Sequence, residues 1–151
     1  IYEDSAPNIQ KGFHIHRTGE RICLIATGYM LHTAIKVADR LQKVGVKVGV
    51  IDLFDLTHFA SDALQEELSK YAGIVSLEEG FKGCGGMDSM LFAFIAQHNL
   101  PLKMLNIGVE GKYRFELGTR QELHEQVGVG ENVALENIKK FINLINLMEE
   151  T

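Results

Sequence analysis

The sequence predicts an α/β domain built on a mostly parallel sheet, because short apolar runs alternate with segments of helical spacing. In Arg21-Ile-Cys-Leu-Ile-Ala-Thr-Gly28, an apolar run stops at a glycine and a helical pattern begins at once. Parallel neighbours need a return of a dozen or more residues, and helices between the runs supply it. We expect parallel strands within the stretches 21–26, 46–53, 73–77 and 102–109.

The first 17 residues predict a connection followed by an extra strand. Residues 1–10 include Asp4, Ser5, Pro7 and Asn8, have no clear period, and are expected to be a linker from a preceding domain, with the domain itself at 11–151. Residues 12–17 alternate and then turn at Thr18-Gly19. This predicts a short strand that runs antiparallel at or near the sheet edge.

Three helices are expected between the parallel strands, at about 30–44, 61–71 and 87–98. The first has a regular apolar face and ends at Gly45, a residue that tolerates positive φ. The second opens on Ser61 or Asp62 as a cap. The third is apolar on several sides and stops before Pro101, so we expect it to be among the most buried helices.

The last part of the chain predicts a loop and two further helices. Residues 108–118 contain three glycines and no helical period. Thr119 begins a brief helix with Glu122 at capping-box distance. The glycines of Gly128-Val-Gly130 end it, and a final helix with one apolar stripe runs to about Met148.

Composition narrows the class of protein. A chain of 151 residues that is 46% hydrophobic is about one domain long and can bury a core. The net charge of −5 argues against nucleic acid as a partner. Two cysteines, one inside an apolar run, favour a reducing, cytoplasmic setting. No apolar run approaches the roughly 20 residues of a membrane span, and a chain that begins at Ile1 is expected to be part of something longer.

The segment 77–88 is the strongest candidate for a functional site. It joins the third parallel strand to a helix at the carboxyl edge of the sheet, where ligands of open α/β folds bind. Two interpretations are open: a ligand or catalytic site, or glutamates that accept backbone N–H groups while glycines allow close packing, which we favour. Cys84 is a candidate nucleophile without a histidine nearby in sequence. The candidate residues here are Glu78, Glu79, Gly83, Gly85 and Gly86.

Two pairs of residues are candidates for anion or subunit contacts. Gly28, at a strand end and helix start, offers free N–H groups, and His32 on that helix faces the same sheet edge, although a tight turn and an exposed histidine are the simpler interpretations. Arg114 and Arg120 flank the loop and short helix, and are candidates to clamp a phosphate or a carboxylate of another subunit. Surface ion pairs are the alternative.

His14 and His16 share one face of the predicted edge strand and offer two ligands to a metal. No third ligand of suitable spacing is evident, so we favour an edge strand with two polar residues. The residues alone therefore assign no catalytic, cofactor-binding or metal-binding residue.

The order of the motifs resembles the C-terminal domain of the transketolase family of thiamine diphosphate enzymes. This family also includes deoxyxylulose-phosphate synthases and the beta subunits of 2-oxo acid dehydrogenases. The resemblance covers nearly the whole chain. Its pieces are Gly12, Ile22-Cys-Leu-Ile-Ala-Thr-Gly28, Val46-Lys-Val-Gly-Val-Ile-Asp52-Leu, Val75-Ser-Leu-Glu-Glu79-Gly, Gly83, Gly85, Gly86, Phe115-Glu-Leu-Gly118, Glu122-Leu123 and Val127-Gly128-Val.

The resemblance implies a three-layer α/β/α fold whose five-stranded, mostly parallel sheet has one antiparallel strand. It also implies that the complete enzyme binds thiamine diphosphate and magnesium between other domains, one of which carries a Gly-Asp-Gly motif that this chain lacks. This domain alone is then expected to bind no cofactor and to be inactive. Its partners are expected to be other domains or subunits of the parent enzyme, in a homodimer without membrane or nucleic acid.

The choice of subfamily rests on one departure. The segment after Asp52 lacks the Lys-Pro-hydrophobe-Asp sequence common in dehydrogenase beta subunits and synthases. We therefore favour transketolase-type transfer of a two-carbon ketol unit between sugar phosphates. The alternatives are a 2-oxo acid dehydrogenase beta subunit, a deoxyxylulose-phosphate synthase, an assembly module without catalysis, and a small independent enzyme or anion sensor.

Overall fold

The computed structural model describes residue 2 and residues 7–149 and has one five-stranded sheet in the order β1-β3-β2-β4-β5. β1 pairs antiparallel with β3, and the other three pairs are parallel. The predicted α/β sheet with one antiparallel edge strand is confirmed. The strands are β1 Phe13–Arg17, β2 Ile22–Ala26, β3 Gly49–Leu53, β4 Gly73–Phe81 and β5 Lys103–Val109.

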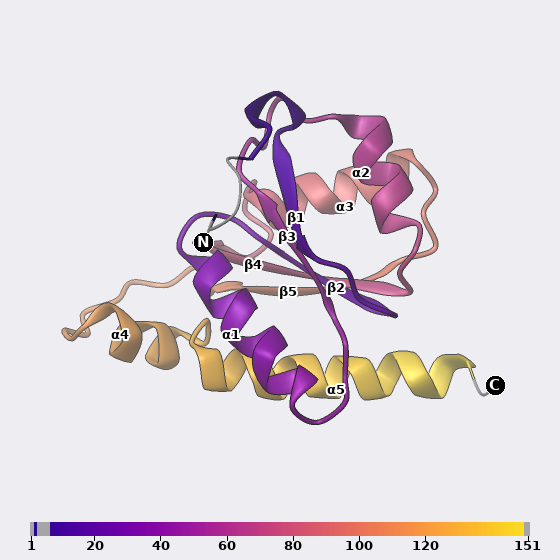
Figure 1. Ribbon diagram of the computed structural model, residues 1–151. Helices are drawn as coiled ribbons and strands as arrows, with labels where there is room; N and C mark the ends of the chain where they lie inside the picture. The colour runs from indigo at the N-terminus through magenta and orange to yellow at the C-terminus, as the bar shows by residue number, and fades with distance from the viewer. Residues whose placement is uncertain (1, 3–6, 150–151) are drawn as a thin grey trace.

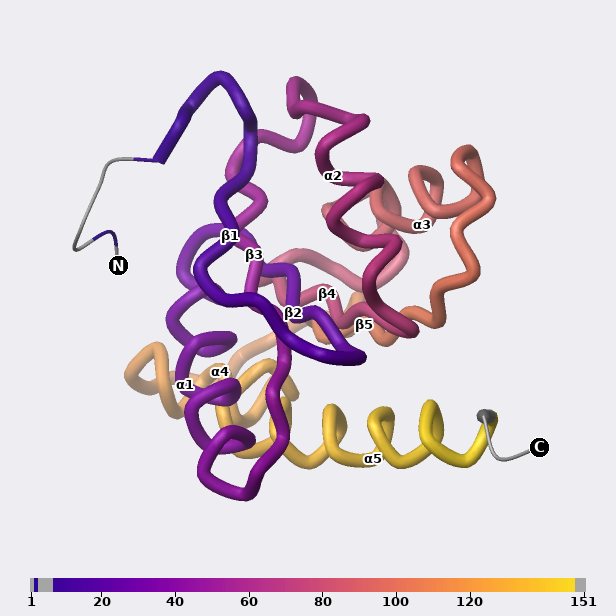
Figure 2. Tube along the Cα trace, turned by 45° about the vertical axis from the view of Figure 1, so that its right-hand side comes forward, coloured from indigo at the N-terminus to yellow at the C-terminus, as the bar shows by residue number. Residues whose placement is uncertain are grey.

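Helices cover both faces of the sheet, which makes the three predicted layers (Figure 1). α1 and α5 lie on one face and α2 and α3 on the other, as Figure 2 also shows. This arrangement follows from the parallel order, because each crossover has to return over a face of the sheet. The helices are α1 Met30–Gln42, α2 Ser61–Leu68, α3 Met87–Gln97, α4 Arg120–Val127 and α5 Glu131–Glu149.

The core has two halves, one on each side of the sheet. Leu24 and Val50 pack towards α1 and α5, whereas their neighbours Ile25 and Ile51 pack towards α2 and α3. Side chains of a strand alternate between faces, so strands buried on both sides are continuous apolar runs. Cys23 is fully buried among them, as expected.

Two strands differ in length from the prediction, and pairing explains both. β3 begins at Gly49, because its parallel ladder with β2 starts there and its antiparallel partner β1 reaches only to Val50. β4 continues past the predicted end at Leu77 to Phe81, which pairs with Val109 of β5. These ends of β4 and β5 form a ribbon that extends beyond the rest of the sheet.

The expectation that the third helix is among the most buried is wrong. Of the apolar side chains of α3, Met87, Leu91 and Phe94 are buried, whereas Phe92 is 68% exposed. α3 is an outer layer and packs on the sheet with one side only. The apolar residues of its outer side are therefore open to solvent.

The last two helices begin and end as the sequence predicts. Thr119 caps α4 in a capping box with Glu122, and Gly128 ends α4 with a φ of 87°. Residues 110–127, which we call the arm, lead from β5 through this short helix towards α5. Figure 1 shows α4 beyond the end of the sheet, away from α2 and α3.

Candidate functional site

Glu78 lies at the carboxyl edge of the sheet and caps helix α3. Its carboxylate accepts the backbone N–H groups of Met87 at 2.9 Å and Asp88 at 2.8 Å, and the residue is only 5% exposed. A carboxylate at a helix N-terminus satisfies orphan donors and complements the helix dipole. Gly86 has to be small, because a Cβ there would lie 2.3 Å from the Glu78 carboxylate. Glu78 thus takes the position that an external anion would need.

The loop 82–86 is fastened to the same helix by Asp88, which is 1% exposed. The Asp88 carboxylate accepts the Gly83 N–H at 2.6 Å and the Asn106 side-chain amide at 3.2 Å. The Gly85 N–H is donated to Ser89 Oγ at 3.1 Å. Gly83 and Gly85 both have positive φ, which explains their glycine identity. Side chains of α3 therefore bind two backbone N–H groups of this loop.

Glu79, next to Glu78 in β4, points instead towards the arm. Its carboxylate lies 2.8 Å from His124 Nε2 and 3.8 Å from Arg120 Nε. The Arg120 guanidinium lies 4.4 Å from the ring centre of Tyr29, and the Tyr29 and His124 rings meet edge to face at 5.5 Å. These side chains, which we call the Glu79 cluster, attach α4 to the carboxyl edge of the sheet.

His124 and Tyr29 are members of this cluster that sequence reasoning missed. The sequence contains a pattern that points to each of them. For His124, the pattern is its spacing of four residues from Arg120, which places the two side chains on one face of a helix. Tyr29 follows Gly28 directly at the predicted strand end. What joins them to Glu79 is tertiary, since 45 residues separate Glu79 from His124.

Gly28 turns the chain from β2 into α1 with a φ of 58°, and no side-chain cap binds the start of α1. His32 is exposed and packs at 5.3 Å against the Tyr29 ring. Both residues therefore lie beside Tyr29 of the Glu79 cluster. Their role as anion contacts stays a prediction.

A small cavity of about 40 Å³ lies beside this cluster. That volume suits a few water molecules, whereas ligand pockets are typically about 300–1,000 Å³. The chemistry available in it is the binding of water or a small ion. Its lining residues are Tyr29, Thr33, Lys36, Gln121, His124, Gly130 and Glu131.

Arg114 and Arg120 contact different residues. The Arg114 guanidinium lies 3.8 Å from Glu116 on the same segment, whereas Arg120 is paired with Glu79. Arg114 Nε is buried and has no hydrogen-bond partner among the described residues. Backbone N–H groups, its own first, together with Arg114 and Lys112, lower the pKa of the Glu116 carboxyl. The predicted clamp by the two arginines stays a prediction.

The arm exposes apolar side chains to an unusual degree. Tyr113, Phe115 and Leu117 are 92%, 88% and 93% exposed, and Phe81 at the ribbon end is 51% exposed. A mostly apolar hollow of about 300 Å³ lies between Phe81 and the segment 111–113. We call these four side chains and the hollow the arm surface. Large exposed apolar surfaces mark interaction sites.

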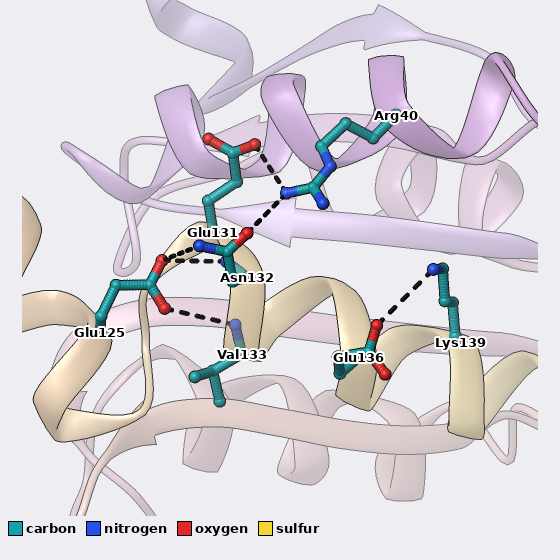
Figure 3. A network of polar contacts seen from close by, with 7 residues as sticks. All are labelled: Arg40, Glu125, Glu131, Asn132, Val133, Glu136 and Lys139. Atoms are coloured by element: carbon teal, nitrogen blue, oxygen red, sulfur yellow. Dashed lines mark hydrogen bonds and ion pairs between the residues drawn. The ribbon is translucent and has the colours of Figure 1, made fainter.

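The far end of the arm is held by polar contacts with the first turn of α5, which in turn contacts α1 (Figure 3). Glu125 accepts the backbone N–H groups of Asn132 at 3.0 Å and Val133 at 3.4 Å, and so caps α5. Arg40 of α1 lies 3.0 Å from Glu131 and 2.9 Å from the Asn132 side chain. The arm is thus anchored at α4 while its apolar stretch 113–117 stays open.

Two further observations bear on cofactors and membranes. Within residue 2 and residues 7–149, no group of three His, Cys, Asp or Glu side chains is arranged to hold a metal ion. Among the helices of the same residues, none combines the length and apolar character that crossing a bilayer requires.

The chain belongs to the family described as "Transketolase, C-terminal domain", because its residues 12–135 match the model of that family. Curated relatives include 1-deoxy-D-xylulose-5-phosphate synthases. That of Pseudoalteromonas translucida is 28% identical over 84% of this chain and 19% of its own length, and that of Aquifex aeolicus is 26% identical over 74% and 17%. The chain therefore spans about a fifth of the curated relatives that it matches.

Solved structures agree with the fold. A split-gene transketolase, described as an inactive beta4 tetramer, superposes with a TM-score of 0.77 at 23% identity, covering 91% of this chain and 45% of that chain. The transketolase of Campylobacter jejuni gives a TM-score of 0.66 at 18% identity, covering 89% of this chain and 19% of its own. The predicted family and three-layer fold are both confirmed.

Proposed function

We propose that this chain is the C-terminal domain of a thiamine diphosphate-dependent transketolase-type enzyme and contributes to assembly, not to the cofactor chemistry. The complete enzyme transfers two-carbon ketol units between sugar phosphates. The observation that carries the assembly role is the arm surface, with its nearly fully exposed Tyr113, Phe115 and Leu117. Leaving such side chains in water forgoes roughly 1.5–3 kcal/mol each.

The residues at the carboxyl edge of the sheet support a role without cofactor binding. The carboxylates of Glu78 and Asp88 are occupied by backbone and side-chain donors of this chain. The cavity beside the Glu79 cluster is far smaller than a diphosphate cofactor requires. In this proposal, thiamine diphosphate and its magnesium ion are bound by other segments of the parent protein.

The arm surface fits the remaining domains or the second subunit of the parent enzyme as its partner. The curated relatives are about five times longer than the part that this chain matches, so a complete protein of that length has ample surface to cover it. The anchoring of α4 by the Glu79 cluster holds the arm in place before that contact forms. A homodimer in the cytoplasm is the assembly that we expect.

A second candidate function is a deoxyxylulose-phosphate synthase, and the curated relatives favour it. Two of them are named 1-deoxy-D-xylulose-5-phosphate synthase at 28% and 26% identity. Assaying the complete parent protein for 1-deoxyxylulose 5-phosphate, and separately for ketol transfer between sugar phosphates, decides between the two. Either activity leaves the assembly role intact.

The experiment that tests the cofactor half of the proposal is calorimetric titration with thiamine diphosphate and magnesium. We expect no binding by the 151-residue chain and saturable binding by the complete parent protein. Binding by the 151-residue chain would contradict the proposal, because it requires a cofactor site within this domain.

The assembly half is tested by replacing the three exposed arm side chains with serine in the complete protein. Sedimentation of the variant Tyr113→Ser/Phe115→Ser/Leu117→Ser should show a weakened subunit or domain contact. Val44→Ser is the matched control, since Val44 follows α1, is 67% exposed and belongs to neither the ribbon nor the arm. Equal sedimentation of both variants and the parent would contradict an assembly role for the arm.

A further inference from the structure

The corner between α4 and α5, residues 128–130, contains two glycines. Gly128 ends α4 with a φ of 87°, and Gly130 directly precedes the first turn of α5. Val129 between them is fully buried, and the N–H groups of Val129 and Gly130 are donated to the His124 carbonyl at 2.9 and 2.8 Å. These bonds hold the turn, but glycine restricts the backbone less than any other residue. The relative direction of the two helices therefore depends on side chains as well.

Glu125, in the last turns of α4, spans this corner with its side chain. One carboxylate oxygen accepts the backbone N–H of Asn132 at 3.0 Å and its side-chain amide at 3.2 Å. The other oxygen accepts the Val133 N–H at 3.4 Å. The amide oxygen of Asn132 in turn accepts a hydrogen bond from Arg40 of α1 at 2.9 Å. Figure 3 shows this chain of contacts, which fixes α4 to the first turn of α5.

The residue before Glu125 fixes α4 on another side. His124 Nε2 lies 2.8 Å from the carboxylate of Glu79 at the edge of the sheet. Successive residues of an α-helix project about 100° apart, so the two contacts hold different sides of α4. A short helix can pivot about a single contact, whereas two contacts on different sides determine one direction.

We propose that Glu125 is a positioning residue, which together with His124 sets the direction of α4 and thereby the place where the arm surface meets its partner. The apolar stretch 113–117 leads through Thr119 directly into α4, so turning α4 moves the end of that stretch. The inference rests on the proposed function, because it takes the arm surface as the contact with other domains or a second subunit. Glu125 lies outside that surface and acts on it through α4.

Gly130 provides a second way to disturb the same corner while the carboxylate is kept. A Cβ at Gly130 would lie 2.3 Å from Cδ of Glu125 and 2.7 Å from its Cα. Alanine at this position can be accommodated only if α4 and Glu125 move away from the start of α5. Gly130→Ala should therefore turn α4, as Glu125→Ala does, without the loss of a charge.

The first test measures the direction of α4 in the 151-residue chain by residual dipolar couplings of its backbone amides. In the parent chain, one alignment tensor should fit the amides of α1, α4 and α5 together. In Glu125→Ala, the couplings of residues 120–127 should no longer fit the tensor of the other two helices. Glu125→Gln keeps a side-chain oxygen as an acceptor and should restore most of the fit.

Glu136→Ala is the matched control, since Glu136 is an exposed glutamate of α5 that pairs with Lys139. It should leave the fit unchanged. Cα chemical shifts of residues 120–127 separate a turned helix from an unfolded one, and we expect them to stay helical in Glu125→Ala. An unchanged fit in Glu125→Ala would overturn the proposal. Loss of the helical shifts would overturn it too, because Glu125 would then support the helix itself and not its direction.

The second test measures assembly of the complete parent protein by sedimentation. If α4 points in the bound direction for only about one-tenth of the time, the apparent dissociation constant rises about tenfold. We expect a weakening of this order in Glu125→Ala and Gly130→Ala and none in Glu136→Ala. Unchanged assembly with a turned α4 would overturn the positioning role. If the serine variant of the arm still weakens assembly in that case, the proposed function stands, so the two failures are distinguishable.

Discussion

The β4–α3 junction and the arm differ in whether their side chains have partners within this domain. At the junction, Glu78 and Asp88 are buried and accept donors from their own chain. On the arm, Tyr113, Phe115 and Leu117 are almost wholly in water. The polar groups of the junction are satisfied within this domain, whereas the apolar side chains of the arm are left in water. Under the proposed function, the junction is therefore a structural region and the arm is the contact region.

The largest expected effect is at the junction, in Glu78→Ala. This change leaves the N–H groups of Met87 and Asp88 buried without an acceptor and should lower the free energy of unfolding by about 3 kcal/mol. Urea denaturation followed by circular dichroism measures it.

Glu79→Ala is the matched control, because Glu79 is the next residue and its side chain is 44% exposed. Its pairs with His124 and Arg120 are partly screened by solvent, so we expect a loss of at most about 1 kcal/mol. Equal losses in the two variants would show that burial does not distinguish the junction from the arm's attachment.

A smaller effect is expected when a methyl group is added at the junction. In Gly86→Ala the new Cβ would lie 2.3 Å from the Glu78 carboxylate, and crowding of this kind costs about 1–3 kcal/mol. Gly111→Ala on the arm meets no atom within 4 Å and should be within about 0.5 kcal/mol of the parent. Urea midpoints measure both, and a destabilised Gly111→Ala would mean that the arm is packed more tightly than the structure shows.

The smallest stability effect is expected at the cap of α4. Thr119→Ala removes the side-chain half of the capping box and should cost about 1 kcal/mol of local stability. Amide hydrogen exchange of residues 120–127 measures it. Thr57→Ala, in an exposed turn outside the arm, should leave the exchange of α4 unchanged.

The same cap predicts a pH dependence confined to α4. Hydrogen bonds from the Thr119 backbone and hydroxyl lower the pKa of Glu122 below its ordinary 4.5. A lowered pKa means that the cap contributes fully above about pH 4.5 and is lost as the pH falls through the lowered value. The protection of α4 amides, corrected for the intrinsic pH dependence of amide exchange, should therefore fall below pH 4.5, and Glu122→Gln should abolish that fall. An identical pH profile in Glu122→Gln would exclude this carboxylate as its source.

The sequence predicted the parts of the fold that local chemistry determines. The apolar run ending at Gly28 and the Thr119 capping box both occur where they were expected. It also anticipated that Glu78 or Glu79 would accept backbone N–H groups, which Glu78 does. These features depend on neighbours in sequence and on the 2.0 and 3.6 residue periods.

What the sequence could not predict depends on distant partners. The extension of β4 to Phe81 requires Val109, and the contact of Glu79 requires His124. Burial of α3 was overestimated because composition does not tell which side of an apolar helix meets the sheet. The hydrogen bond from Tyr2 to Asp52 likewise joins residues that are far apart in the sequence.

The most direct test of the central claim is hydrogen exchange of residues 111–118 in the 151-residue chain and in the complete parent protein. We predict fast exchange in the isolated chain and strong protection in the assembled enzyme, with little change at the β4–α3 junction. Equally fast exchange of 111–118 in both proteins would contradict the claim that the arm is the contact surface of this domain.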